Sequence, residues 1–482
     1  MRSARICASL EEAVGDIRDD SSIMVPGFGP GAPLNLVGAL HRQGARGLTV
    51  IANGAGVAGA GSVKTHADLI ADGRVRKLVA SFTASPHPSR AGVAEALAQS
   101  GAMEVELVPQ GTLAERIRAG GAGIPAFFTP TGAGALLAAG KREEEFGGRN
   151  YLLEHALTAD FAFIRAWKAD TAGNLVYRLA ARNYNPIMAM AARCVIVEVE
   201  QPILPAGSIQ PDEIHTPGVY VHRMVQIPPD GTFAVHRRQN GATKPTSTKE
   251  STGPAGVTNE RSRLTRDQIA AVIARYLEPG WVVNLGIGIP TLASNYLESE
   301  HNVLLTSENG LVGYGLVAPD GMEDLDVVNA GVDYVLLEPG ASVVHHGDSF
   351  ALIRAGRVDC VALGAYEVAP DGSFANWKVQ PSTLANLGGV GGAMDLAACA
   401  KQVFIAMEHT TPDGRPRLVE HCSLPVTAAR GVTLVVTDLA VIAVRDGQFV
   451  LLEHAPGYSV QEIQALTGAP LSIDPDLRPI PV

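Results

Sequence analysis

Residues 280–297 read GWVVNLGIGIPTLASNYL, an apolar run that meets two glycines and a proline and then continues at helical spacing. This order is typical of a buried strand that turns through glycine into a helix. Residues 21–40 read SSIMVPGFGPGAPLNLVGAL and repeat the order, with Pro33 in the place of Pro290. A strand, a glycine turn and a helix therefore recur in each half of the chain.

Short, continuous runs of apolar and β-branched residues recur along both halves. Runs of this kind are typical of strands that are covered on both faces, as in parallel sheets. Helical stretches such as 109–119 and 460–467 lie between them. The alternation predicts an α/β fold with two similar domains, each built on an open, largely parallel sheet. The runs are 48–53, 194–199, 303–307, 334–339 and 433–437.

The boundary between the halves lies at 239–264, where large apolar residues almost vanish and Ser, Thr, Gly, Pro and charged residues take over. Such a composition is typical of a linker. Thr265 and Gln268 then show the spacing of a helix-opening capping box. We predict one domain over 1–238 and a second over 265–482.

Composition and charge exclude several classes of protein. Apolar residues make up 46% and charged residues 18%, which favours large cores over a disordered chain. The net charge of -11 disfavours a nucleic-acid partner, because it repels phosphate backbones. The five cysteines show no C-x-x-C spacing, which indicates a reducing compartment. With no secretory signal and no apolar stretch long enough to span a bilayer, we expect a cytoplasmic protein without a membrane partner.

The glycine loop at 27–31 has more than one interpretation. A dinucleotide-binding fingerprint needs an acidic residue at the end of the next strand, and Asn53 stands there instead, which disfavours nicotinamide binding. The glycines can have a purely structural role in a tight turn, or they can let backbone N–H groups approach an anionic ligand. We favour ligand binding at 27–31 and 286–288, because ligands of open α/β sheets gather at this edge.

Residues 306–315 read TSENGLVGYG and place Glu308 where an apolar strand gives way to a loop with glycines. A carboxylate at such a strand end is well placed to act as a nucleophile. The alternative is a glutamate that caps a helix or stabilises a turn. As a nucleophile, Glu308 has to stay ionised near neutral pH, which requires hydrogen bonds to its charged form. Asn309 and nearby backbone amides are the candidate donors.

The SENG stretch, followed by Gly313, resembles the nucleophile signature of the family I coenzyme A transferases. The resemblance covers most of both halves and includes ARNYNPIM (181–188) and NLGIGIPTLAS (284–294). It implies that the halves correspond to fused α and β subunits, each with the fold shared with ribose-5-phosphate isomerase. It also implies that CoA moves between an acyl-CoA such as succinyl-CoA and a 3-oxoacid such as acetoacetate.

In the ping-pong reaction that the resemblance implies, Glu308 attacks the thioester and becomes a glutamyl-CoA thioester, from which a second acid takes the CoA. CoA esters are substrates, and no metal or external cofactor is needed. The family places an oxyanion-binding backbone N–H at Gly389 and a first-half side chain, Gln110, at the acyl group. The remaining residues expected to contact substrate or CoA are Gly27, Phe28, Gly29, Gly31, Asn53, Gly286, Gly288, Gly310 and Gly388.

The sequence departs from the family near this site. Val332 stands where related enzymes often have lysine, so a CoA contact is missing or comes from elsewhere. His345 and His346 replace small polar residues; such a pair is most often structural, and no third metal ligand has an obvious spacing. The region lies near the acyl pocket of the family, which leaves acetoacetate, 3-oxoadipate, acetate and other short acids open as acceptors.

Two other functions stay open. An acyl-CoA hydrolase would use Glu308 with water as the acceptor. A non-catalytic sensor of CoA esters or sugar phosphates would share the fold, although the intact SENG stretch weighs against it. The resemblance also implies a homodimer or a larger homo-oligomer.

Overall fold

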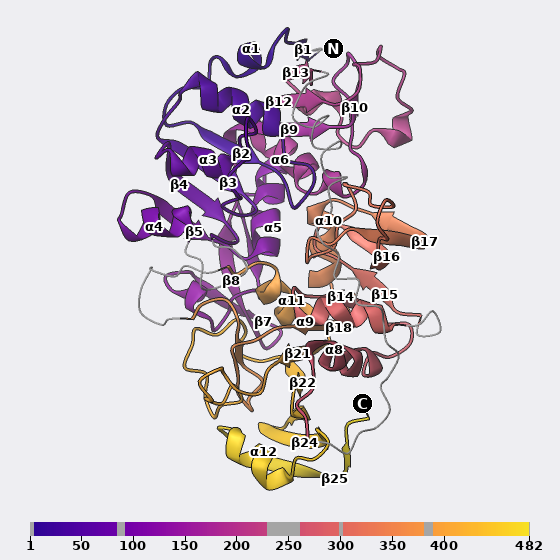
Figure 1. Ribbon diagram of the computed structural model, residues 1–482. Helices are drawn as coiled ribbons and strands as arrows, with labels where there is room; N and C mark the ends of the chain where they lie inside the picture. The colour runs from indigo at the N-terminus through magenta and orange to yellow at the C-terminus, as the bar shows by residue number, and fades with distance from the viewer. Residues whose placement is uncertain (1–3, 84–91, 229–260, 298–301, 380–388, 482) are drawn as a thin grey trace.

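The computed structural model describes residues 4–83, 92–228, 261–297, 302–379 and 389–481. It contains two large sheets, one in each half of the chain, with helices packed between and around them (Figure 1). Most of the predicted linker 239–264 lies outside the described residues, so the predicted domain boundaries stay predictions.

The first half begins with alternating strands and helices and ends with strands that return to the same sheet. Its elements are β1 (Arg5–Ile6), α1 (Leu10–Val14), β2 (Ser22–Val25), α2 (Leu34–Gln43), β3 (Leu48–Ala52), α3 (His66–Ala71), β4 (Val75–Ala80), α4 (Val93–Gln99), β5 (Glu104–Leu107), α5 (Gln110–Gly121), β6 (Ala126–Thr129), η1 (Leu136–Ala138), β7 (Glu143–Phe146), β8 (Arg149–His155), β9 (Ala159–Ala166), β10 (Lys168–Ala169), β11 (Leu175–Val176), η2 (Leu179–Arg182), α6 (Asn185–Ala191), β12 (Ala192–Val199), η3 (Pro211–Glu213), η4 (Gly218–Tyr220) and β13 (Arg223–Gln226).

The second half follows the same plan with additional antiparallel strands. Its elements are α8 (Arg266–Arg275), β14 (Val282–Leu285), α9 (Ile289–Leu292), η5 (Ala293–Tyr296), β15 (Leu304–Thr306), β16 (Leu311–Val317), β17 (Val335–Val343), α10 (His346–Arg354), β18 (Cys360–Leu363), β19 (Glu367–Val368), β20 (Phe374–Ala375), α11 (Ala393–Cys399), β21 (Gln402–Met407), β22 (Val432–Thr437), β23 (Ala440–Arg445), β24 (Gln448–His454), α12 (Val460–Leu466) and β25 (Leu471–Pro479).

The two large sheets share one strand order in their centres, which confirms the prediction of two similar open-sheet α/β domains. The first sheet runs β1-β13-β12-β9-β2-β3-β4-β5 and is parallel throughout. The second runs β17-β16-β15-β14-β18-β21-β22-β23-β24-β25. The series β13-β12-β9-β2-β3 therefore corresponds to β22-β21-β18-β14-β15, and both series follow the same order along the chain.

The outer strands of the second sheet differ from the parallel arrangement predicted for both halves. β16 and β17 pair antiparallel at one edge, and β22, β23 and β24 pair antiparallel near the other. The run 334–339 does form part of β17, but most of that strand is partly or fully exposed because it lies at the sheet edge. Apolar continuity alone does not separate such a strand from one that is covered on both faces.

The glycine turns that open the two halves differ in length. β2 ends at Val25 and α2 begins at Leu34, whereas β14 ends at Leu285 and α9 begins at Ile289. Pro290 consequently lies in the first turn of its helix, while Pro33 precedes its helix. The repeat is therefore real at the level of strand, turn and helix, but its prolines do not occupy equivalent positions.

A shared apolar core joins the halves. One cluster of buried residues includes Leu113 and Tyr184 of the first half together with Phe350 and Leu396 of the second. Helix α5 of the first half packs against α10 and α11 of the second, near the middle of the molecule (Figure 1). Among the described residues, none of the helices has both the length and the apolar character needed to cross a bilayer.

Candidate active site

Glu308 lies in the tight turn that connects β15 to β16, as its position after an apolar strand predicts. The Gly310 N–H donates to the Ser307 carbonyl oxygen at 3.0 Å, and the Ser307 N–H donates to that of Leu311 at 2.9 Å. Gly310 has a φ of +105°, and a Cβ there would lie 1.9 Å from the Val344 carbonyl oxygen. Gly310, predicted to contact substrate, is thus required by the turn that presents Glu308.

The carboxyl group of Glu308 is buried, with 7% of the residue exposed. Its Oε2 atom has no hydrogen-bond partner among the described residues. Burial raises the pKa of Glu308 to about 7, and a backbone hydrogen bond opposes this only in part. Burial therefore opposes ionisation of this group, and no described protein donor contacts its Oε2 atom.

Asn309 does not supply the hydrogen bond to Glu308 that the sequence led us to expect. Its amide nitrogen donates to the Val328 carbonyl oxygen at 2.7 Å, and its amide oxygen accepts from the Leu311 N–H at 3.4 Å. The side chain thus anchors the turn to a neighbouring loop of the second half. The absence of this expected donor is consistent with the raised pKa of Glu308.

A cavity of about 390 Å³ opens beside Glu308, and all of its lining residues belong to the second half. A Cβ on Gly392 would lie only 3.1 Å from Oε1 of Glu308, so the backbone at Gly392 packs directly against the carboxyl group. Three predicted site residues line this cavity together with Glu308: Gly286, Gly288 and Gly389.

Gly389 and its neighbours join the second half to the first. The Gly389 N–H donates to the Trp377 carbonyl oxygen at 3.3 Å, and the N–H groups of Val390 and Gly391 both donate to the Ser81 carbonyl oxygen. The amide of Gly389 is thus engaged within the protein, and its role as an oxyanion donor stays a prediction. Gly388 lies outside the described residues.

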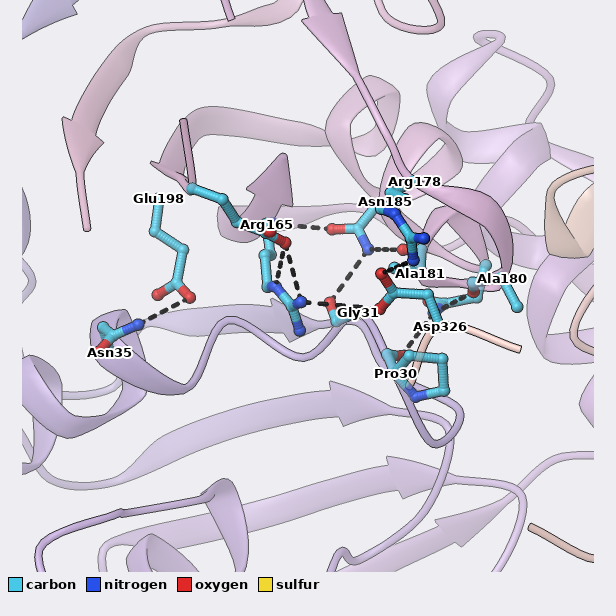
Figure 2. Close-up of polar contacts among 12 residues, drawn as sticks. Pro30, Gly31, Asn35, Arg165, Arg178, Ala180, Ala181, Asn185, Glu198 and Asp326 are labelled. Carbon is cyan, nitrogen blue, oxygen red and sulfur yellow. Dashed lines mark hydrogen bonds and ion pairs between the residues drawn. The ribbon is translucent and has the colours of Figure 1, made fainter. Parts of the chain in front are cut away.

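The first-half glycine loop packs against protein and does not line this cavity. A Cβ on Gly29 would lie 2.9 Å from Cγ2 of Val328 in the second half. A Cβ on Gly31, where φ is +87°, would lie 2.5 Å from the Ala181 carbonyl oxygen. The Asn185 side chain donates to the Gly31 carbonyl oxygen at 3.1 Å (Figure 2). The Gly29 contact reaches the second half, whereas Gly31 packs within the first half, and the predicted role of these glycines toward a ligand stays a prediction.

A group of charged residues holds the halves together beside this loop (Figure 2). The Arg178 guanidinium donates to Asp324 at 2.6 Å and to Asp326 at 2.7 Å, across the interface. Asp326 also lies 3.8 Å from Arg165 of the first half. Because Asp326 is two residues from Val328, which accepts from Asn309, this group stabilises the loop on which the Glu308 turn is anchored.

Four residues that the sequence placed at or near the site meet in one buried region. The side-chain nitrogen of Gln110 lies 2.8 Å from Nε2 of His346. Phe28 lies with its ring centroid 5.7 Å from that of His346. The Tyr184 hydroxyl donates to the Asn53 side chain at 3.0 Å. The interface thus brings together side chains from widely separated segments of the chain.

Gly392, which packs against Glu308, and Asp395 of the same stretch are two residues that sequence reasoning did not single out. Asp395 is fully buried in α11 and accepts from the Gly111 N–H at 2.8 Å and the Thr131 hydroxyl at 3.0 Å. Burial raises the pKa of Asp395 to about 6. Both residues belong to the GGAMD stretch at 391–395, where paired glycines before a buried acidic residue were the available signal.

The sequence profile of the family described as Coenzyme A transferase matches residues 7–226 and 266–466. The chain therefore belongs to the coenzyme A transferase family and is a CoA-transferase enzyme. This membership agrees with the resemblance found in the motifs.

Particular relatives extend the match to nearly the whole chain. Succinyl-CoA:3-ketoacid coenzyme A transferase 2A, mitochondrial, from Mus musculus is 38% identical over 97% of this chain and 90% of its own. The human protein, coenzyme A transferase 2 of the same description, is 38% identical over 99% of this chain and 92% of its own. A Bacillus subtilis relative, one of the subunits of a probable succinyl-CoA:3-ketoacid coenzyme A transferase, is 46% identical over 46% of this chain and 89% of its own. This separate subunit matches only one half of the chain, which agrees with two subunits fused into one chain.

The fold is also that of known structures. An acyl-CoA transferase apoenzyme from Escherichia coli O157:H7 superposes with a TM-score of 0.75, covering 99% of this chain and 95% of that chain at 19% identity. At this identity the likeness concerns the fold alone.

The expected cytoplasmic location is wrong. The nearly full-length mouse and human relatives are described as mitochondrial. Scattered cysteines and the lack of apolar spans are compatible with more than one reducing compartment, so composition could not decide between them.

Proposed function

We propose that the protein transfers CoA from succinyl-CoA to a 3-oxoacid such as acetoacetate, with Glu308 as the covalent nucleophile. The observation that carries the proposal is a buried carboxyl group beside a cavity of about 390 Å³, with one oxygen that no described protein group engages. The names of the mouse and human relatives support the choice of succinyl-CoA and a 3-oxoacid.

The chemistry needs only the glutamate and the two substrates. A Glu308 oxygen attacks the thioester carbonyl carbon, the C–S bond breaks, and a mixed anhydride and CoA thiolate form. The thiolate then attacks the glutamyl carbonyl carbon, the bond between that carbon and the bridging oxygen breaks, and the first acid leaves as its carboxylate. The second acid repeats the two steps in reverse. Each step exchanges one anion for another, so we propose that neither a metal nor an external cofactor takes part.

Burial of Glu308 suits a transferase better than a hydrolase. The anhydride and the glutamyl thioester both hydrolyse unless water is kept away from the carbonyl carbon. Glu308 is 7% exposed, and the Gly392 backbone covers one of its oxygens. Removal of water also strengthens the interaction of fixed N–H dipoles with a developing oxyanion. We propose the Gln110 side chain and the backbone N–H of Gly392 as sources of such donors, because the N–H groups of 389–391 already donate within the protein.

Arg266 supplies the cation that Val332 does not. Its guanidinium lines the cavity and comes within 3.6 Å of the position that a Cβ would take on Gly288. No ion pair holds Arg266 within the part of the chain that the structure describes. CoA carries a pyrophosphate and a 3′-phosphate, and arginine binds phosphate through paired N–H donors. We propose that Arg266 binds one of these phosphates while the thiol end reaches Glu308.

Two further statements rest on the family resemblance and are proposed with it. The protein forms a homodimer or a larger homo-oligomer, which light scattering coupled to gel filtration tests directly. The acceptor is a 3-oxoacid, which turnover of succinyl-CoA with acetoacetate, 3-oxoadipate and acetate tests by comparison of kcat/KM.

One experiment tests the central assignment. The protein is incubated with succinyl-CoA alone, and its intact mass is measured before and after reduction with borohydride. We expect a CoA adduct whose reduced form maps to the peptide that contains Glu308, and no adduct in Glu308→Gln. An adduct on another residue, or steady hydrolysis of succinyl-CoA without an acceptor acid, would overturn the proposal.

A further inference from the structure

His346 lies at the start of α10 in a fully buried position between the two halves. Its ring stacks on that of Tyr184, with centroids 3.9 Å apart and planes at 23°. The rings of Phe28 and Phe350 complete its surroundings at 5.7 Å and 5.4 Å. Its backbone N–H donates to the Asn183 carbonyl oxygen at 3.0 Å. Ring and backbone are thus both fixed, and two of the three aromatic neighbours come from the first half.

The hydrogen bond between His346 and Gln110 defines the state of the imidazole. The two nitrogen atoms lie 2.8 Å apart. The side-chain amide nitrogen of Gln110 can donate a hydrogen bond but cannot accept one. Nε2 of His346 therefore accepts, and the ring proton lies on Nδ1. Burial, reinforced by His345, holds the pKa of His346 well below its ordinary value, which is consistent with a neutral ring. Nδ1 has no partner among the described residues.

Gln110 connects this imidazole to the backbone beside the nucleophile. It is the first residue of α5 and only 2% exposed. Its backbone N–H donates to the Gly391 carbonyl oxygen at 2.9 Å. The residue that follows Gly391, Gly392, packs against Glu308. The Gln110 backbone therefore lies where the first half approaches the segment that packs against Glu308, and its side-chain amide contacts His346.

We propose that His346 is a positioning residue that orients the Gln110 amide toward the bound acid and thereby sets the preference for an acid with a 3-oxo oxygen. One amide hydrogen is given to His346, which leaves the second hydrogen to donate to substrate. A site that presents a fixed donor rejects an acid lacking the matching oxygen, because the donor then stays unpaired. This inference rests on the proposed function of Glu308.

The test is a double-mutant cycle on the full-length enzyme. His346→Phe keeps a flat ring against Tyr184 and removes the acceptor for Gln110, and Gln110→Ala removes the donor. With succinyl-CoA as donor, kcat/KM is measured for acetoacetate and for butyrate, which lacks the 3-oxo oxygen. We expect His346→Phe to lower the value for acetoacetate by about 10- to 100-fold and that for butyrate much less. In the Gln110→Ala background, the second substitution should have almost no further effect.

Additive effects of the two substitutions, or an equal fall for both acids, would overturn the inference. His346→Gln, which keeps a polar acceptor without the ring, is the second variant. If circular dichroism shows that His346→Phe does not fold, His346→Gln takes its place. We expect His346→Gln to retain part of the preference for acetoacetate over butyrate. Loss of all preference in His346→Gln would contradict the inference. Formation of the CoA adduct from succinyl-CoA alone separates the two proposals. An adduct in the wild type with an unchanged preference in the variants refutes only the role of His346, whereas absence of the adduct in the wild type refutes the proposed function.

Discussion

The Asp326 carboxylate of the second half lies 2.7 Å from the Arg178 guanidinium of the first half, and Asp326 is only 1% exposed. The pair ties a first-half segment to the loop that holds Asn309 and, through it, the turn of Glu308. The geometry of the Glu308 turn therefore depends on the contact between halves, of which Figure 2 shows the Arg178 and Asp326 pair, as well as on the half that contains it.

Arg178→Ala should destabilise the protein by about 2–3 kcal/mol, because it removes a cation from a buried carboxylate and leaves Arg165 as the more distant partner. Urea denaturation followed by circular dichroism measures the change. Arg178→Ala combined with Asp326→Asn should be more stable than Arg178→Ala alone, because the buried charge is removed as well. If the double variant is the less stable of the two, the pair does not act as described.

Glu308→Gln should raise stability above neutral pH. Burial raises the pKa of Glu308 from its ordinary value of 4.5 to about 7, so the unfolded chain releases this proton at lower pH than the native one. The contribution of Glu308 to stability therefore falls as pH rises from 4.5 to 7, and it then stays lower. Glutamine imitates the neutral form, and we expect a gain of about 2–3 kcal/mol at pH 8 that shrinks toward pH 5. Urea midpoints at several pH values measure it, and a gain that is constant over this range would contradict the raised pKa.

Formation of the CoA adduct should slow as pH falls below about 7, because only the ionised Glu308 attacks the thioester. The expected profile rises through pH 7 and becomes level near pH 8. Single-turnover mixing with succinyl-CoA, followed by acid quench and intact mass, measures the rate. A rate that is unchanged down to pH 5 would show that burial does not control this carboxyl group.

Arg266→Ala should raise KM for succinyl-CoA by about tenfold, in keeping with the loss of one charge-assisted phosphate contact. Turnover of succinyl-pantetheine, which lacks the nucleotide phosphates, should change little. Arg266→Lys should recover part of the affinity. Arg415→Ala serves as the control, because Arg415 is exposed and pairs with Asp413. Equal losses with both thioesters would place Arg266 in a structural role.

Gly392→Ala should lower kcat by at least about tenfold with little loss of folding stability. The new Cβ would lie 3.1 Å from Oε1 and 3.2 Å from Cγ of Glu308, so the carboxyl group has to move. Gly38→Ala is the matched control, because its Cβ would meet only Arg42 at 3.6 Å. Steady-state turnover and thermal unfolding of both variants provide the comparison, and normal turnover in Gly392→Ala would rule out this contact as a determinant of the site.

Much of the fold follows from local pattern. The runs 48–53 and 194–199 became β3 and β12, and the stretch 109–119 became most of α5. Thr265 and Gln268 form the predicted capping box at the start of α8. The antiparallel edge at β17 was not predictable, because an apolar run carries no information on the direction or exposure of its neighbours.

The sequence by itself determined the order of strands and helices, the two-domain plan and the position of Glu308 after an apolar strand. These features follow from residue periodicity and turn chemistry, which act over a few residues. The tertiary structure alone decided that Gly392 covers the Glu308 carboxyl group, that Asn309 faces Val328, and that Gln110 meets His346. The first two contacts are selected by packing within the second half and the third by packing of one half against the other, so no local pattern records them.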